Sequence, residues 1–172
     1  MVIIVTGASH TGKTALSQKL LEKYKYPYLS LDHLKMGLIR SGNTKLSVFD
    51  DELLTPYIWS IAKEIVKTAV ENGQNLIIEG CYVPFDYADD FEPFYLEKIK
   101  FICLVMSRSY IENNFSDIER YADIIEKRLE NDVSKQFLIK ENEKNLKLCQ
   151  KYGIEYILID EKYDIKIIGE EF

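Results

Sequence analysis

The stretch GASHTGKT at residues 7–14 lies between the apolar run VIIV (2–5) and the segment ALSQKLLEKY (15–24). The spacing G-x-x-x-x-G-K-[ST] is met by Gly7, Gly12, Lys13 and Thr14. This pattern requires a strand before it and a helix after it, and the flanking residues fit both. Glycines lack a Cβ, so backbone N–H groups can curl around an anion, and a helix N-terminus favours negative charge there. The pattern predicts a phosphate-binding loop; the alternative is an ordinary strand-to-helix turn that contains glycine.

The loop predicts a site for ATP and Mg²⁺. In loops of this pattern the lysine reaches the β- and γ-phosphates, and the hydroxyl at the position of Thr14 ligates Mg²⁺. His10 occupies a free position of the pattern, and neither His10 nor His33 has a metal-ligand partner at useful spacing. The residues expected to contact the nucleotide are Gly7, Ala8, Ser9, His10, Thr11, Gly12, Lys13, Thr14 and Ala15.

Length and composition are those of one globular domain. The 172 residues are enough for one well-buried core, so we expect a single domain over residues 1–172. Hydrophobic residues make up 47% of the chain and charged residues 29%, which excludes extensive disorder. The formal net charge of −6 would repel a polyphosphate backbone unless a local basic patch overcame it. We therefore expect no nucleic-acid partner.

The cysteines and the N-terminus bear on the compartment. Cys81, Cys103 and Cys149 are far apart and form no C-x-x-C pair, so we expect reduced cysteines rather than a disulfide framework or a zinc site. The N-terminal MVIIVTG has no basic region or cleavage signal, and no apolar run approaches the roughly 20 residues that span a bilayer. The expectation is a cytoplasmic protein with no membrane partner; the oligomeric state is open.

Apolar runs rich in Ile and Val alternate with longer helical stretches along the chain. The runs predict buried parallel strands at 2–5, 75–80, 100–106 and 154–160, with a weaker strand at 27–32. Such alternation favours an α/β fold: a three-layer, doubly wound sheet of about five parallel strands with helices on both faces. Ligands bind such sheets at the carboxyl ends of the strands.

Capping signals predict where the helices begin and end. A first helix covers residues 13–24, and a second is opened by Thr55 and Pro56 and stopped at Asn72-Gly73. Ser116 and Glu119 have capping-box spacing, which predicts a helix over about 117–131. A last helix is predicted from about Ser134 to Tyr152, ended by Gly153.

Taken together, these features resemble the adenylate-kinase-like group of small P-loop kinases. The resemblance rests on the phosphate loop, an acid after the second strand, Glu79-Gly80 after the third, and arginines after the fourth. It follows the order of elements along the whole chain, but only GASHTGKT is a specific motif. It implies the P-loop NTPase fold, ATP and Mg²⁺ as cofactors, a small-molecule acceptor bound by segments about 33–50 and 81–95, and a lid-like segment at about 108–131.

The resemblance gives two acids a role. Asp32 ends the predicted strand PYLSLD, and in similar kinases the matching acid accepts the proton of the attacked hydroxyl; the alternative is an N-cap for a helix starting at His33. Glu79 resembles the acid that holds magnesium or its bound water; the alternative is a carboxylate satisfied by backbone N–H groups.

The resemblance also gives roles to arginines and to one tyrosine. Arg40 would grip a phosphate or carboxylate of the acceptor, because a guanidinium matches two oxygens. Arg120, Arg108 and Arg128 would neutralise charge on the transferring phosphoryl group, although no close R-x-x-x-x-R cluster is present. Tyr82 would wall in the acceptor. For Arg40 and Arg128 a solvated surface position is the alternative.

These predictions lead to an ATP-dependent phosphotransferase that moves the γ-phosphoryl group to a small-molecule acceptor, with a hydroxyl as the expected nucleophile. One alternative is a nucleoside monophosphate kinase, although LIIEGCYVPFD lacks the D-G-x-P-R-like signature of many such enzymes. Another is a non-catalytic ATP-binding switch or sensor; no guanine-specifying N-K-x-D is present. The sequence does not separate a metabolic role from a toxin or resistance role.

Overall fold

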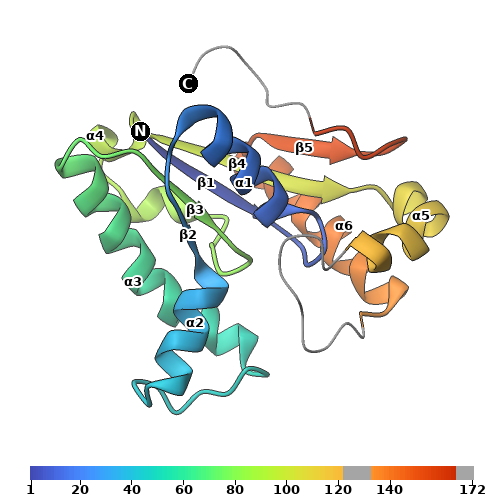
Figure 1. The fold of residues 1–172 in the computed structure, drawn as a ribbon, viewed down its shortest axis with the longest axis horizontal. Coiled ribbons are helices and arrows are strands. Elements are labelled where there is room, and N and C mark those ends of the chain that lie inside the picture. Colours follow the sequence, from blue (N-terminus) through green and yellow to red (C-terminus); the bar gives the residue numbers. More distant parts are fainter. Residues whose placement is uncertain (122–132, 166–172) are drawn as a thin grey trace.

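The computed structural model describes residues 1–121 and 133–165. These residues form one five-stranded sheet with helices on both faces (Figure 1). The elements in chain order are β1 (Val2–Gly7), α1 (Lys13–Tyr24), β2 (Tyr28–Ser30), α2 (Leu31–Arg40), α3 (Asp51–Glu71), β3 (Leu76–Glu79), the 3₁₀ turn η1 (Tyr87–Asp90), α4 (Pro93–Leu96), β4 (Ile99–Met106), α5 (Arg108–Tyr121), α6 (Lys135–Tyr152) and β5 (Tyr156–Ile159).

The sheet order is β2-β3-β1-β4-β5, and every pair of neighbouring strands is parallel. The carboxyl ends of the strands therefore meet at one edge of the sheet, and the loop that follows β1 lies at its centre. In Figure 1 the sheet runs through the middle of the molecule, with α2 and α3 on its left and α5 and α6 on its right. The predicted α/β class and the parallel sheet are confirmed.

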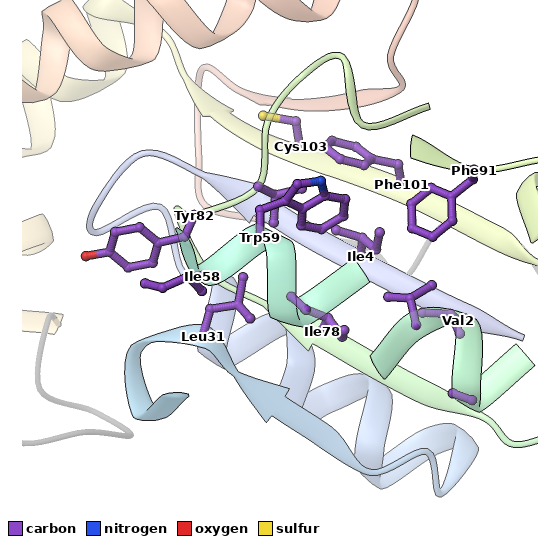
Figure 2. Close-up of a cluster of buried hydrophobic side chains, with 14 of the residues drawn as sticks. Val2, Ile4, Leu31, Ile58, Trp59, Ile78, Tyr82, Phe91, Phe101 and Cys103 are labelled. Carbon is purple, nitrogen blue, oxygen red and sulfur yellow. The ribbon is translucent and has the colours of Figure 1, made fainter. Parts of the chain in front are cut away.

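Residues of β1 alternate between two buried clusters, as the period of two in a strand requires. Val2 and Ile4 pack with α3 on one face of the sheet, where Figure 2 shows Ile4 beside Trp59. Ile3 and Val5 pack with α1 and α5 on the other face. Because both faces are covered by helices, residues 2–5 of β1 are all apolar, and the three-layer arrangement follows.

Two predicted helix starts are wrong. The helix predicted to open at Thr55-Pro56 begins at Asp51, so Pro56 lies inside α3; buried Leu54, with 1% exposure, is part of this additional turn. The helix predicted over 117–131 is already under way at Arg108 and has a non-helical residue at Asn114, so Ser116 is not its N-cap. The rest of that predicted range, 122–131, lies outside the described residues.

Other boundaries are close to those predicted. The last helix is confirmed: Ser134 is the N-cap of α6, its side chain accepts a hydrogen bond from the N–H of Phe137, and Gly153 ends the helix with φ 65°.

Asp32 neither ends a strand nor caps a helix that starts at His33. Strand β2 stops at Ser30 and α2 starts at Leu31, which places Asp32 in the first turn of α2.

Candidate functional site

The loop between β1 and α1 depends on two glycines. Gly7 has φ 145°, and a Cβ there would run into the backbone carbonyl of Leu104 on the neighbouring strand β4. Gly12 is the N-cap of α1 with φ 85°, and a Cβ there would run into the hydroxyl of Tyr163. Both positions combine a left-handed backbone with a close neighbour, so only glycine fits them without strain.

Side chains of the loop fold back onto its own backbone. The hydroxyl of Thr11 and the ammonium of Lys13 both donate to the carbonyl of Ala8, each at 2.9 Å. Thr11 and Lys13 are buried, whereas Ser9 and His10 are partly exposed and share a hydrogen bond of 2.8 Å between Oγ and Nδ1. Since the first N–H groups of a helix have no acceptor within it, the N-terminus of α1 at Lys13–Ala15 completes an anion cradle.

The hydroxyl of Tyr163 lies against this loop at Gly12. Partial burial raises the pKa of Tyr163 to about 12, with a smaller contribution from Tyr110. The hydroxyl therefore keeps its proton at neutral pH, and it lies 3.4 Å from the carbonyl oxygen of Thr11, to which it donates.

Glu79, the predicted partner of Thr14 in a Mg²⁺ site, lies beside the start of α1. It is the last residue of β3 and 1% exposed, and its Oε2 accepts a hydrogen bond from the hydroxyl of Thr14 at 3.4 Å. A hydroxyl and a carboxylate are the oxygen ligands that Mg²⁺ prefers in nucleotide sites. Thr14 and Glu79 therefore fit a magnesium ion that is bound together with phosphate oxygens.

Gly80 holds the end of β3 against β1. Its N–H donates to the carbonyl of Val5 at 3.1 Å, and its carbonyl accepts from the hydroxyl of Thr6 at 2.9 Å. Gly80 has φ 155°, and a Cβ there would approach the Cβ of Leu31 at 2.8 Å. This close approach brings the start of α2, and with it Asp32, next to the strand that carries Glu79.

A cleft of about 1130 Å³ opens over this edge of the sheet. Gly7, Ala8, Ser9 and Lys13 of the phosphate loop form one part of its wall. The remaining walls come from α2, from the start of α3, from the segment after β3 and from α6, and those used below are Asp32, Lys35, Arg40, Asp51, Tyr82 and Phe85. The predicted acceptor-side segments thus contribute to the same cleft as the loop.

Tyr82 joins three elements of the cleft wall by hydrogen bonds. Its hydroxyl accepts from the Lys35 ammonium of α2 at 2.6 Å and donates to Asp51 Oδ1 of α3 at 2.8 Å. Lys35 also lies 3.5 Å from Asp32 Oδ1. Burial raises the pKa of Tyr82, and its hydrogen bond to Asp51 raises it further.

Sequence reasoning missed Lys35 and Asp51. A signal for Lys35 exists, because Asp32 and Lys35 are three residues apart and such pairs meet on a helix surface. No local pattern relates Asp51 to Tyr82, which is 31 residues further along the chain. Two other aromatics of the 81–94 stretch, Tyr87 and Phe91, pack in the core, where Tyr87 stacks on Phe101 with 4.4 Å between ring centroids.

The predicted arginines lie in different places. Arg40 is exposed at the end of α2 and lines the cleft. Arg108 is exposed at the start of α5, where its guanidinium donates to Glu143 at 2.6 and 2.9 Å, and Arg120 is exposed in the last turn of α5. Neither Arg108 nor Arg120 is among the described residues that line the cleft. Arg128 lies outside the described residues.

The ion pairs of Arg108 explain the direction of its pKa. The hydrogen bond to Glu143 is the largest cause that raises the pKa of the Arg108 guanidinium, and Glu112, at 3.7 Å, adds to it. In this arrangement Arg108 ties α5 to α6. A role on phosphate would require it to leave Glu143.

Searches of sequence and structure give different results. No protein-family model matches the chain, and the curated proteins contain no match to it. Among the described residues, no helix is both long and apolar enough to cross a bilayer.

Solved structures, by contrast, match along nearly the whole chain. A putative kinase from Chloroflexus aurantiacus j-10-fl has a TM-score of 0.56 and 21% identity, covering 96% of this chain and 91% of that one. A gluconokinase from Sinorhizobium meliloti 1021 has a TM-score of 0.51 and 14% identity, with 92% and 81% coverage. A deoxyadenosine kinase from M. mycoides, bound to dCMP and dCDP, has a TM-score of 0.51 and 18% identity, with 93% and 90% coverage. The chain therefore has the three-layer α/β fold of the small P-loop kinases.

Proposed function

We propose that this protein is an ATP-dependent phosphotransferase that moves the γ-phosphoryl group of ATP to a hydroxyl of a small molecule. The observation that carries the proposal is one cleft lined both by Lys13 of the phosphate loop and by the carboxylate-bearing residue Asp32 of α2. The kinases with the same fold support phosphotransfer in general. ATP as the donor and a hydroxyl as the nucleophile are our inference from the loop and from Asp32.

The proposed roles follow from where the side chains lie. Backbone N–H groups of the loop bind the phosphates, and Lys13 exchanges its bond to the Ala8 carbonyl for phosphate oxygens. Thr14 and Glu79 would hold Mg²⁺, which supplies positive charge to the phosphate oxygens when bound. Arg40 would bind an anionic part of the acceptor, and Tyr82 forms part of the acceptor wall.

Asp32 is the proposed proton acceptor. As the acceptor's oxygen forms its bond to the γ-phosphorus, the bond from that phosphorus to the bridging oxygen of ADP breaks. The hydroxyl proton passes to the Asp32 carboxylate, and ADP leaves with the former bonding electrons. Phosphoryl transfer needs positioning and charge neutralisation more than covalent catalysis, so one well-placed carboxylate suffices.

The first test measures nucleotide binding. Calorimetry with a non-hydrolysable ATP analogue and Mg²⁺ should show binding to the wild type and strongly weakened binding to Lys13→Ala. Lys147→Ala serves as the matched control, because Lys147 is exposed on α6 outside the cleft lining. If the analogue does not bind the wild type, or if it binds Lys13→Ala equally well, the phosphate-loop assignment is wrong.

The second test identifies the acceptor. ADP formation from Mg²⁺ and ATP is measured against a panel of sugar acids, polyols, nucleosides and nucleoside monophosphates. We expect one hydroxyl compound to stimulate turnover, and Asp32→Asn to lower that rate by about 10²–10⁴-fold, the usual contribution of a general base. Diphosphate production from a monophosphate would instead indicate a nucleoside monophosphate kinase. Tight ATP binding with no stimulation by any compound would favour a nucleotide-binding switch.

A further inference from the structure

A short chain of contacts, made of one ion pair and two hydrogen bonds, runs along the cleft wall and ends at the proposed base. It links Asp32 to Lys35 at 3.5 Å, Lys35 to the Tyr82 hydroxyl at 2.6 Å, and that hydroxyl to Asp51 at 2.8 Å. The four residues come from α2, from the segment after β3 and from the first residue of α3. This chain of contacts therefore joins side chains from three segments that meet only in the folded protein.

The direction of each hydrogen bond in this chain is fixed by chemistry. A lysine ammonium can only donate, so the Tyr82 oxygen must accept from Lys35. The single phenolic proton of Tyr82 then goes to Asp51. Burial of the Tyr82 ring, together with Asp51 and the more distant Asp32, raises the pKa of Tyr82, which keeps this proton in place at neutral pH. The arrangement thus presents a charged ammonium to Asp32.

Tyr82 itself has little freedom to move. It is 5% exposed and belongs to the buried cluster that includes Leu31 and Ile58. Figure 2 shows its ring at the margin of this cluster with the hydroxyl pointing away from the other side chains. The core therefore sets the position of the Tyr82 oxygen, and that oxygen sets the position of the Lys35 ammonium, which also lies 5.0 Å from the centre of the same ring.

An ion pair between Asp32 and Lys35 would not by itself hold a carboxylate in one place. The Asp32 side chain is 46% exposed, and pairs of this kind on a helix surface contribute little because both side chains lose rotamer freedom. Lys35 differs from an ordinary surface lysine: its side chain is 15% exposed, and Tyr82 already fixes its end. The contacts of Lys35 with Tyr82 therefore already offset the loss of rotamer entropy of the Lys35 side chain, and the ion pair with Asp32 does not have to.

We propose that Lys35 and Tyr82 are positioning residues, which hold the Asp32 carboxylate in the orientation that accepts the proton of the acceptor hydroxyl. The proposal rests on the proposed function for the role of Asp32, but the linkage itself is a property of the protein alone. Asp51 holds the Tyr82 hydroxyl and so anchors the end of this chain of contacts that is furthest from Asp32. Because a misplacement of about 1 Å can lower a rate by about 10²-fold, such support is expected to affect turnover strongly.

The linkage is tested without any ligand. The ¹³C chemical shift of the Asp32 carboxyl carbon is measured by NMR in the wild type, Lys35→Met and Tyr82→Phe. Both substitutions should move this signal. The control is Lys67→Met, which removes another lysine with an i,i+3 partner, Glu64 at 2.9 Å, and with an aromatic ring, Phe91, at 6.0 Å, away from the cleft. An Asp32 signal unchanged in Tyr82→Phe would overturn the linkage.

The kinetic consequence is tested with the acceptor found by the panel. Tyr82→Phe should lower kcat by about 3- to 10-fold and Lys35→Met by about 10- to 100-fold, with KM for ATP nearly unchanged. Lys35→Arg should restore part of the loss. Because Lys35 acts through Asp32, the double variant Asp32→Asn/Lys35→Met should be no slower than Asp32→Asn alone.

Additive losses in the double variant would contradict the proposal, since Lys35 would then act on the substrate directly. A variant of Lys35 or Tyr82 that raised only KM and left kcat unchanged would also contradict it. Failure of the proposed function has a different signature: the wild type would transfer phosphate to no compound, or Asp32→Asn would transfer it at the wild-type rate. In that case the NMR measurement still decides whether Tyr82 and Lys35 fix Asp32.

Discussion

At the scale of single residues, the phosphate loop requires a residue without a side chain at position 7, and Gly7 meets this requirement. Its φ of 145° and the backbone carbonyl of Leu104 exclude a side chain from two directions. A neighbouring side chain could move aside, but the carbonyl belongs to β4, the strand paired with β1 through six residues. The loop and the sheet therefore constrain the same position.

We expect Gly7→Ala to destabilise the protein by about 2 kcal/mol or more, because a left-handed conformation and a backbone clash add. The matched control is Gly37→Ala in α2, where a Cβ would have nothing within 4 Å. That change should stabilise by about 0.5–1 kcal/mol, since alanine loses less backbone entropy in a helix than glycine does. Urea unfolding of both variants checks this. A Gly7→Ala protein as stable as the wild type would contradict our reading of the loop.

Much of the site can be read from the sequence at this scale, but not all of it. The loop residues are predictable because their spacing is local and each has a mechanical reason. Glu79 follows from its place at the end of an apolar strand. Asp51 does not, because its contact with Tyr82 depends on how the 40–50 connection returns to the cleft, and no periodic pattern describes that connection. The spacing of Lys35 from Asp32 is a local signal, but its bond to Tyr82, 47 residues further along the chain, is not predictable from a local pattern.

At the scale of elements, Ser134 caps a helix and Ser116 does not, although the sequence around both has capping signals. Ser134 precedes α6 with extended backbone, and its Oγ accepts a hydrogen bond from the N–H of Phe137 at 3.2 Å. Ser116 has similar local sequence signals but lies inside α5, two residues after the irregular Asn114. A serine can cap only where the helix has N–H groups without acceptors.

Accordingly, Ser134→Ala should lower the free energy of unfolding by about 1 kcal/mol, the usual value of an N-cap side chain. Ser116→Ala should change it by less than about 0.5 kcal/mol, as is typical of exposed positions. Chemical denaturation of the two variants under identical conditions makes the comparison. Equal losses would show that α5 is interrupted at Asn114 enough to start a new helix there.

Elements were easier to predict than their boundaries. The strands were found because β1 and β4 are apolar on both faces, and α6 because it has both a cap and a glycine stop. The start of α3 was misplaced because Thr55-Pro56 satisfies a local rule for a first turn. Burial of Leu54 in the cluster that includes Leu31 and Ile58 favours continuing the helix toward Asp51, and this tertiary contact is not visible in the local pattern.

At the scale of the whole molecule, several contacts tie the outer segments to the layer formed by α3. The carboxylate of Asp90, in η1, accepts hydrogen bonds from the Lys63 ammonium at 2.6 Å and from the Trp59 indole N–H at 2.7 Å. The bond from Lys63 is the largest cause that lowers the pKa of Asp90, and the bond from Trp59 also lowers it, against the opposing effect of partial burial. Asp90 therefore couples protonation to the packing of η1 on α3.

This coupling predicts a particular pH dependence. A carboxyl whose pKa is lower in the folded than in the unfolded protein stabilises the fold above the unfolded pKa, 3.8 for Asp90. The contribution disappears as the pH falls through the lower, folded pKa. Asp90→Asn should therefore be less stable than the wild type at pH 7, and the difference should shrink below about pH 3.8. Urea unfolding at pH 7 and at a pH below about 3.8 measures this difference in stability. The control is Asp89→Asn, a substitution at the exposed neighbouring residue. A constant difference would contradict the coupling.

The order of strands along the sheet was not predicted from the sequence, although the parallel class was. Alternation of strands and helices restricts the topology to doubly wound sheets, but the pairing of β3 between β1 and β2 depends on contacts such as those of Gly80 with Val5 and Leu31. These contacts join residues far apart in the chain, and they also bring the carboxylates of the cleft to one edge.

Trp59 is the chain's one tryptophan, is 4% exposed, and donates its indole proton to Asp90. Its fluorescence therefore reports on a single known environment, since no second indole contributes to the emission. Water reaching this ring would shift the emission to longer wavelength, so one optical signal follows the opening of the α3 layer. The same fluorescence can be followed while nucleotide is added, and a constant emission wavelength would mean that the packing around Trp59 stays closed.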